Sequence, residues 1–213
     1  MIRHAVSRAE PHDARAFLPR RGGTPAHRRA AAECRGCALH EHATQTVFGA
    51  GKASARLMLV GEEPGDREDT EGEMENTYVT NAVEHFEFEQ AAPGKRRIHK
   101  PPSPREMTAC RPWLGAELRI VAPELVVALG ATAAKSLLGH DFRVSHHRGV
   151  PLTAPEGTDA TVVATLHPSA VLRADNREQA YEGLVADLKV AGEALGAGRS
   201  GGRADGVRGP VAL

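Results

Sequence analysis

The stretch Glu124-Leu125-Val126-Val127-Ala128-Leu129, followed by Gly130, decides the fold class of this 213-residue chain. Its nearly continuous apolar residues are typical of a strand buried on both faces of a parallel sheet. Gly130 ends the run, and residues 131–138 (ATAAKSLL) continue it with a helical pattern. A strand that leads through a glycine into a helix is the repeating unit of α/β proteins. The stretch therefore predicts an α/β domain.

Three further apolar runs predict strands, and they alternate with predicted helices. The strands are expected at 55–60, 77–83 and 161–165, and the other helices at 28–33, 105–120 and 176–195. Ser103 is expected to cap the helix at 105–120, with Pro104 at its first position, and Pro112 is expected to kink or split it. The pattern predicts a three-layer α/β/α fold around a four-stranded parallel sheet.

Length and composition limit the domain count and the kind of partner. The chain is long enough for one domain with a sizeable core, expected at 24–195, between a disordered basic arm at 1–23 and a Gly-rich disordered tail at 196–213. Lys and Arg total 27, as do Asp and Glu, so contact with nucleic acid must be local. Aromatic residues are only 4%, too few for a platform that stacks single-stranded bases.

The sequence gives no sign of a membrane or of secretion. No apolar run approaches the length of a membrane span, and the N-terminus lacks the apolar core of a signal peptide. We therefore expect a cytoplasmic monomer with no membrane partner.

Polar residues follow three of the predicted strands. Gly61-Glu62-Glu63-Pro64-Gly65-Asp66 comes after the first of these strands along the chain, Asn81 lies at the end of the second, and His167-Pro168-Ser169 follows the last. In open parallel sheets the ligand binds outside the carboxyl ends of the strands. These residues are therefore expected to line one crevice.

The run Gly94-Lys95-Arg96-Arg97-Ile98-His99-Lys100 predicts a basic loop, because Pro101 and Pro102 close it and prevent a helix. Such a loop suits a phosphate backbone, whose condensed counterions Lys and Arg displace. His99 is the one side chain in the run that can be neutral and nucleophilic near pH 7. A solvated basic run or a localisation signal is the competing interpretation.

Three cysteines suggest a metal or redox site. Cys34-x-x-Cys37 precedes the domain body, and Cys110 lies far downstream. This spacing is compatible with zinc, a redox pair or an iron–sulfur cluster, and buried structural cysteines are a further alternative. A set of four ligands lacks one member, which a histidine such as His85 could supply. In a reducing compartment disulfides are not expected.

Taken together, the motifs resemble those of one enzyme family. They are Cys34-x-x-Cys37, GE-x-PGD-x-ED at 61–69, YVTNAV at 78–83, ACRPWL at 109–114, LGATAAKSLLG at 129–139 and His167-Pro168-Ser169. From about Ala32 to Leu195 the chain resembles the iron–sulfur uracil-DNA glycosylases. The inserted KRRIH at 95–99 is similar to the loop that marks the UdgX type, which cross-links itself to uracil-containing DNA.

The resemblance implies a cofactor and a base-binding site. The cofactor is a 4Fe–4S cluster held by Cys34, Cys37, His85 and Cys110, with His85 standing where most relatives have cysteine. The base-binding site, which reads a uracil taken out of the base stack, is formed by Glu63, Gly65, Asn81 and His167. In it Asn81 reads the amide edge, and His167 stabilises the charge on the leaving base.

The resemblance also implies a covalent step in base excision repair. After uracil leaves, His99 captures the anomeric carbon and stays bonded to the abasic site, with Glu62 orienting its imidazole and Asp66 positioning water or the loop. Phosphate contacts are implied for Lys95, Arg96, Arg97, Ser169 and Arg173. The implied partner is uracil-containing, single-stranded DNA, which would bring the cytoplasmic protein to the nucleoid.

Two departures from the family keep alternatives open. Glu63 stands where the family has Gln, so one carboxyl of the pair with Glu62 should be harder to ionise. The segment after Asp69 lacks the phenylalanine that stacks on uracil, and residues 62–77 leave little chain for a parallel crossover. Phe48 is a candidate substitute ring. A turnover glycosylase without trapping and a DNA-binding module with an emptied pocket are therefore the competing functions.

Overall fold

The computed structural model describes residues 13–41, 43, 45–62, 76–85, 88–90, 97–154 and 158–201. Its helices are the 3-10 helices η1 (Ala14–Phe17) and η2 (Ala38–Glu41), and the α-helices α1 (Thr24–Ala31), α2 (Pro104–Val121), α3 (Gly130–Leu138), α4 (Val144–His147), α5 (Pro168–Arg173) and α6 (Arg177–Gly201). Its strands are β1 (Ala50–Gly51), β2 (Leu57–Gly61), β3 (Thr77–Asn81), β4 (Phe88–Gln90), β5 (Arg97–His99), β6 (Leu125–Leu129), β7 (Pro151–Thr153) and β8 (Thr161–Thr165).

The central sheet has six strands in the order β1-β3-β2-β6-β8-β7. The middle four strands are parallel, as predicted, but β1 and β7 add antiparallel edges that the sequence prediction missed. Both edges are short, and neither contains the apolar run that marks a buried strand, because an edge strand is partly solvated. The α/β class is confirmed, and the four-stranded parallel sheet is corrected to a mixed six-stranded one.

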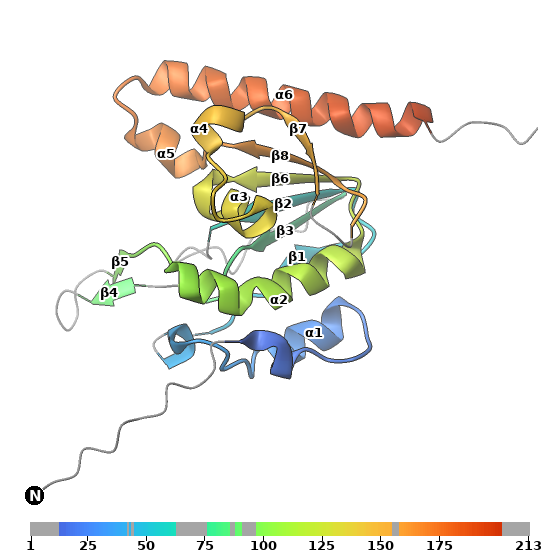
Figure 1. Cartoon of the computed structure of the whole chain (residues 1–213), viewed down its shortest axis with the longest axis vertical. Coiled ribbons are helices and arrows are strands. Elements are labelled where there is room, and N and C mark those ends of the chain that lie inside the picture. Colours follow the sequence, from blue (N-terminus) through green and yellow to red (C-terminus); the bar gives the residue numbers. More distant parts are fainter. Residues whose placement is uncertain are drawn as a thin grey trace, which may run out of the picture.

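Helices cover the two faces of this sheet, with α2 and α3 on one side and α6 on the other (Figure 1). Alternate residues of each strand serve the two faces. One core joins strand residues such as Met58, Val126 and Val162 to apolar side chains of α2 and α3. The second core joins Leu125, Val127 and Val163 to Ala191 of α6. Each fully buried aliphatic side chain contributes about 1.5–3 kcal/mol, so these layers hold the strand ends in place.

The short link between β2 and β3 still allows a parallel pair. The two strands pair at five positions, from Leu57 opposite Thr77 to Gly61 opposite Asn81. This register brings the end of β3 directly beside the end of β2. The carboxyl ends of β2 and β3, where the crevice is predicted, therefore lie side by side despite the shortened connection.

Helix α2 begins as predicted but is not split. Ser103 forms a capping box with Glu106, and Pro104 occupies the first turn. The helix continues through Pro112 to Val121, contrary to the predicted split. Trp113 and Leu114 are buried directly after the proline, and their packing outweighs the one backbone hydrogen bond that proline removes.

The ordered elements extend beyond the predicted domain limits. The described part of the predicted arm contains η1, whose Ala14 is buried in the same cluster as the cysteines. Helix α6 continues to Gly201, beyond the predicted start of the tail. Within the described ranges no helix combines the length and apolar character needed to cross a membrane.

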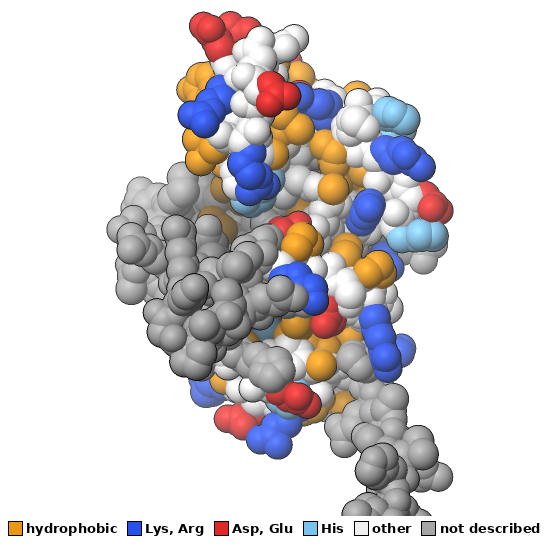
Figure 2. All heavy atoms as spheres, turned by 90° about the vertical axis from the view of Figure 1, so that its left-hand side faces the viewer, with side chains coloured by type: hydrophobic (Ala, Val, Ile, Leu, Met, Phe, Trp, Pro, Cys, Tyr) orange, Lys and Arg blue, Asp and Glu red, His pale blue; other side chains and the backbone are white. Residues whose placement is uncertain are grey.

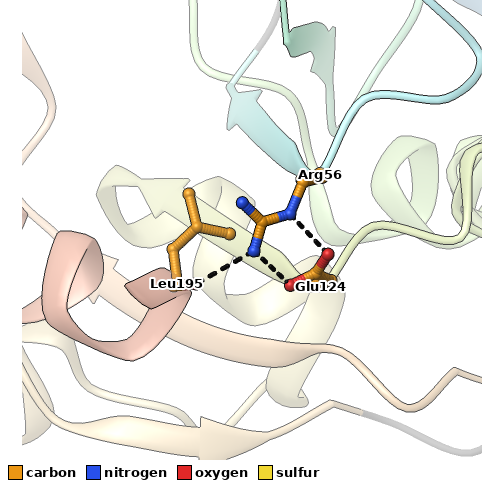
Figure 3. Close-up of polar contacts among 3 residues, drawn as sticks. All are labelled: Arg56, Glu124 and Leu195. Carbon is orange, nitrogen blue, oxygen red and sulfur yellow. Dashed lines mark hydrogen bonds and ion pairs between the residues drawn. The ribbon is translucent and has the colours of Figure 1, made fainter. Parts of the chain in front are cut away.

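An ion pair ties α6 to the sheet at the edge opposite the carboxyl ends of the parallel strands. Arg56 precedes β2 and Glu124 precedes β6, and their side chains form a two-pronged contact at 2.5 and 2.6 Å (Figure 3). The Arg56 guanidinium also donates to the carbonyl oxygen of Leu195 in α6, at 3.1 Å. One side chain therefore joins two strand starts and a helix.

Replacing Arg56 by lysine is expected to lower the melting temperature slightly, because an ammonium group cannot reproduce the two-pronged contact. The pair is partly exposed, so the difference from wild type should shrink in high salt. Thermal melts at low and high salt measure both effects. A difference that does not depend on salt would contradict an electrostatic origin.

Candidate active site and metal centre

The carboxyl ends of four adjacent strands bring together three residues that the sequence predicted at one crevice. Asn81 closes β3, Glu62 follows β2, and His167 follows β8. The backbone amide of Val83 donates to the carbonyl oxygen of Glu62 at 3.2 Å, so the segment after β3 turns over the end of β2. Glu62, Asn81 and His167 therefore lie along one edge of the sheet. Helix α3 begins at the same edge, directly after β6.

Asn81 is held close to the backbone of β2. The side chain is buried, and a Cβ added at Gly61 would lie 2.5 Å from its Oδ1. Real side chains do not tolerate such an approach, so the absence of a Cβ at Gly61 allows the amide to occupy this position. A terminal amide offers one acceptor and two donor hydrogens, which is what recognition of the uracil amide edge requires.

Glu62 has a partner that sequence reasoning missed. Thr132, in the first turn of α3, donates its hydroxyl hydrogen to Glu62 Oε2. The N-terminal turn of a helix also favours a negative charge. In the sequence, Thr132 is visible only as a hydroxyl residue two positions after Gly130, which follows β6. Its contact with Glu62 becomes apparent only in the folded structure. Thr132 therefore fixes one oxygen of the carboxylate.

His167 is oriented by its own turn. The backbone amide of Ser169 donates to His167 Nδ1 at 3.2 Å, and Ser169 Oγ lies 2.8 Å from the same atom. Because Nδ1 accepts the amide hydrogen, the neutral ring carries its proton on Nε2. Gly130 packs against this residue with φ +91°, and a Cβ there would lie 3.0 Å from His167 Cβ. His167 thus presents an N–H donor, and Ser169 orients that ring.

A buried ionic network fastens the strand before His167 to α6. Asp187 accepts hydrogen bonds from Thr165 Oγ1 at 2.5 Å and from Arg148 Nε at 2.8 Å. Thr165 is the last residue of β8, two positions before His167. Sequence reasoning missed this network, because its members lie far apart in the chain. Asp187 therefore determines where β8 ends relative to α6.

Replacing Asp187 by alanine is expected to lower the free energy of unfolding by about 2–4 kcal/mol, since it leaves a guanidinium and a hydroxyl without their acceptor in a buried position. Urea denaturation measures the change. Asp159→Ala, at an exposed loop position, is the control and should stay within about 0.5 kcal/mol of wild type. Equal effects of the two substitutions would contradict the role of Asp187.

The three cysteines meet in a separate buried cluster. Cys34, Cys37 and Cys110 pack with Phe48 and Trp113, and all three thiols are at least nine-tenths buried. Trp113 Nε1 donates to Cys34 Sγ at 3.3 Å, and the backbone amide of Glu84 donates to Cys110 Sγ at 3.3 Å. Donors that point at sulfur are the usual surroundings of metal-bound thiolates.

Phe48 does not replace the missing aromatic of the uracil pocket. It is buried in the cysteine cluster, edge-on to Trp113 with ring centroids 6.1 Å apart. A ring enclosed in this way has no face left for a base. The hypothesis that Phe48 stacks on uracil is therefore wrong.

His85 directly follows Glu84, whose backbone amide contacts Cys110, and it has the properties of a ligand. Its Nε2 lies 2.9 Å from Thr46 Oγ1, whereas its Nδ1 is buried without a hydrogen-bond partner. Burial lowers the pKa of His85 to about 4, so the imidazole is neutral at physiological pH. A neutral, buried imidazole with one orphaned nitrogen fits a metal group that binds nitrogen and sulfur.

The described donors do not form a ready-made single-ion site. Among the described residues, no group of three His, Cys, Asp or Glu side chains could hold one metal ion. Burial also raises the pKa of Cys37 and of Cys110, and a bound metal would offset this by stabilising the thiolates.

Several predicted site residues lie outside the described ranges or are described by backbone alone. Glu63, Gly65, Asp66, Lys95 and Arg96 fall outside. Arg97 and His99 lie on β5, which pairs antiparallel with β4 and places His99 opposite Phe88. The predicted approach of the His99 ring to the crevice therefore stays a prediction.

Lys and Arg side chains lie on the face that carries the strand ends, interspersed with Asp and Glu (Figure 2). Figure 2 looks onto the side toward which β6 and β8 point in Figure 1, and Lys and Arg side chains are spread over it. Arg173, at the end of α5, is one of the exposed cations near His167. A neutral chain with cations on this face fits local contact with phosphates.

Comparison with known proteins agrees with these motifs. Residues 73–189 match the uracil DNA glycosylase superfamily. The chain is 31% identical over 167 residues to the type-4 uracil-DNA glycosylase of Thermotoga maritima, which covers 68% of this chain and 81% of that protein. It is 30% identical over 188 residues to the type-4 uracil-DNA glycosylase of Archaeoglobus fulgidus, covering 76% and 88%. The chain is therefore an enzyme of the uracil DNA glycosylase superfamily.

Proposed function

We propose that this enzyme excises uracil from DNA with Asn81 and His167 as its base-contacting residues. The observation that carries the proposal is that Glu62, Asn81 and His167 all lie at the carboxyl ends of parallel strands of one sheet, after β2, at the end of β3 and after β8. Asn81 pairs with the amide edge of an extruded uracil. The Nε2–H of His167 donates to a uracil carbonyl oxygen, and this hydrogen bond strengthens as the bond to the sugar breaks and its electron pair moves onto the base.

The fate of the sugar is the finer part of the proposal. His99 attacks the anomeric carbon with a ring-nitrogen lone pair, forming the bond that replaces the one to uracil, and the imidazole proton passes to solvent. Glu62, whose Oε2 is fixed by Thr132, stabilises the positive imidazole. Asp66 helps to position the loop or a water molecule. The support is the KRRIH motif at 95–99 together with the prearranged Glu62.

A 4Fe–4S cluster bound by Cys34, Cys37, His85 and Cys110 is the proposed cofactor. When bound, it joins α2 to the segments before β1 and after β3. The support is the shared burial of the three thiols and the orphaned Nδ1 of His85. Zinc is the alternative, and visible absorbance of the purified protein, with iron and sulfide analysis, separates the two.

The proposed partner is single-stranded DNA that contains uracil. The residues proposed to contact phosphate are Lys95, Arg96, Arg97, Arg173 and, beside its contact with His167, Ser169. DNA binding should weaken as the salt concentration rises, because the phosphate contacts release counterions. Glu63 and Gly65 are further members of the proposed uracil site. The proposed place of action is the cytoplasm, at the nucleoid, and the proposed state is a monomer.

One observation favours a second candidate function, a turnover glycosylase without capture. Residues 62–77 contain no aromatic side chain, and Phe48 is enclosed elsewhere. A uracil that lacks a stacking partner loses about 1–3 kcal/mol of binding, which shortens the time available for capture. A DNA-binding module without base release is the remaining alternative.

Incubation with uracil-containing and thymine-containing oligonucleotides distinguishes the three functions. The proposed function gives free uracil and a protein–DNA band that survives heat and detergent, on the uracil strand alone. Free uracil without that band indicates turnover. Equal binding of the two strands without base release would overturn the proposal.

A further inference from the structure

The buried Glu117 of α2 has no place in the site described above, yet it touches the strand that carries Asn81. Its side chain has no solvent exposure. It accepts three hydrogen bonds, from the backbone amide of Gly49 at 3.0 Å, from the Tyr78 hydroxyl at 2.9 Å and from Thr80 Oγ1 at 2.6 Å. Two of the three donors belong to β3, and Thr80 immediately precedes Asn81.

The surroundings of Glu117 leave little freedom of movement. A Cβ at Gly49 would come within 2.5 Å of the Tyr78 ring, so the three segments close over the carboxylate. The carbonyl oxygen of Gly49 in turn accepts from Arg28 Nη2 at 2.9 Å. Tyr78 and Thr80 lie on one face of β3, and both reach the same carboxylate. Glu117 therefore fixes both the rotation and the height of β3 against α2.

Packing alone does not account for a carboxylate at this position. A buried charged group is costly unless it is fully hydrogen-bonded, and an apolar side chain of similar size often packs as well or better. What a fully bonded carboxylate adds is one defined arrangement of the segments around it, as buried polar networks do in some proteins. Here the segment that gains this definition ends at Asn81.

The close packing around Asn81 makes the position of its side chain sensitive to shifts of β3. Its Oδ1 occupies the space that a Cβ of Gly61 would fill, so a shift of β3 against β2 moves the amide directly. Displacements of about 1 Å in a group that orients a substrate can reduce the rate about 100-fold. The hydrogen bonds from Tyr78 and Thr80 to Glu117 tie β3 to helix α2 and oppose such a shift.

We propose that Glu117 is a positioning residue for base recognition. It fixes the position of the Asn81 side chain through its hydrogen bonds with Thr80 and Tyr78. This inference rests on the proposed role of Asn81. Helix α2 also carries Cys110, two turns before Glu117.

The decisive variants are Glu117→Gln and Thr80→Val, with Thr80→Ser as the rescue. Burial raises the pKa of Glu117 to about 7, and glutamine has the same shape as its side chain without the charge. Glutamine cannot accept from Thr80 and Tyr78 with both terminal atoms, and valine removes the Thr80 donor. Glu124→Gln removes a carboxylate at the opposite edge of the sheet and is the matched control.

Two readouts are measured on the holoprotein. The single-turnover rate constant for uracil release is expected to fall about 10- to 100-fold in Glu117→Gln and Thr80→Val, and to stay within about threefold of wild type in Thr80→Ser and Glu124→Gln. The side-chain amide NMR signal of Asn81 is expected to shift in the first two variants and to return in Thr80→Ser. The NMR readout does not require catalysis, so it remains decisive even if the wild type releases no uracil.

A purely structural Glu117 gives a different result. In that case Glu117→Gln and Thr80→Val lower the melting temperature, while the single-turnover rate constant for uracil release and the Asn81 amide signal stay as in Glu124→Gln. That outcome overturns the inference. Should Glu117→Gln fail to fold, Thr80→Val and Thr80→Ser decide alone.

Discussion

Replacing His99 by alanine should abolish the covalent adduct with uracil-containing DNA while leaving the folded protein intact. The imidazole is the proposed nucleophile, and alanine supplies no lone pair that can attack the anomeric carbon. A loss of at least about 1000-fold in adduct formation is expected, as for removal of other catalytic nucleophiles. Denaturing gels after incubation with single-stranded uracil DNA measure it.

Uracil release by the same variant separates capture from excision. Water can attack the sugar cation once His99 is gone, so His99→Ala should release free uracil with turnover. Lys100→Ala, the neighbouring cation, is the control and should still form the adduct with somewhat weaker binding. An adduct of wild-type yield in His99→Ala would refute His99 as the attachment point.

Replacing Cys110 by alanine is expected to have the largest effect on stability. It removes one of four proposed ligands from a buried cluster, and the binding energy of a structural metal group is folding energy. We expect a loss of at least about 5 kcal/mol, or about 10–20 °C in melting temperature for a chain of this size. Visible absorbance, iron content and thermal melts measure the loss of the cluster and of the fold together.

A matched cysteine substitution is not possible, because all three cysteines lie in the cluster. Ser136→Ala on α3 serves instead, since it removes a buried polar atom away from the thiols. It should retain the iron content of wild type. A Cys110→Ala protein with full iron content and an unchanged melting temperature would contradict the proposed ligand set.

The central strands could be predicted because they carry their own signal. Strands β2, β6 and β8 are apolar runs bounded by glycine or polar residues, and the structure places all three within a residue or two of the prediction. Strands β1 and β7 lack such runs, because they are only two and three residues long and lie at the partly solvated edges of the sheet. Local pattern therefore identified the buried strands and missed the edges.

The same distinction holds for the site. The strand-end positions of Glu62, Asn81 and His167 were predictable because each residue follows or closes an apolar strand, and the carboxyl ends of parallel strands share one edge of the sheet. Thr132 could not be assigned, since its partner lies 70 residues away in sequence. One sequence feature indicates that Glu117 is buried. Its carboxylate lies on the same face of helix α2 as Cys110 and Leu114. A charged residue on an apolar helix face indicates a buried partner but does not identify it.

Intact mass measurement of the wild-type holoprotein after reaction with a uracil-containing single strand tests the central claim most directly. The expected product has the mass of protein plus oligonucleotide less one uracil, and peptide mapping should place the DNA on His99. Unmodified protein beside an oligonucleotide that still contains its uracil would contradict both excision and capture.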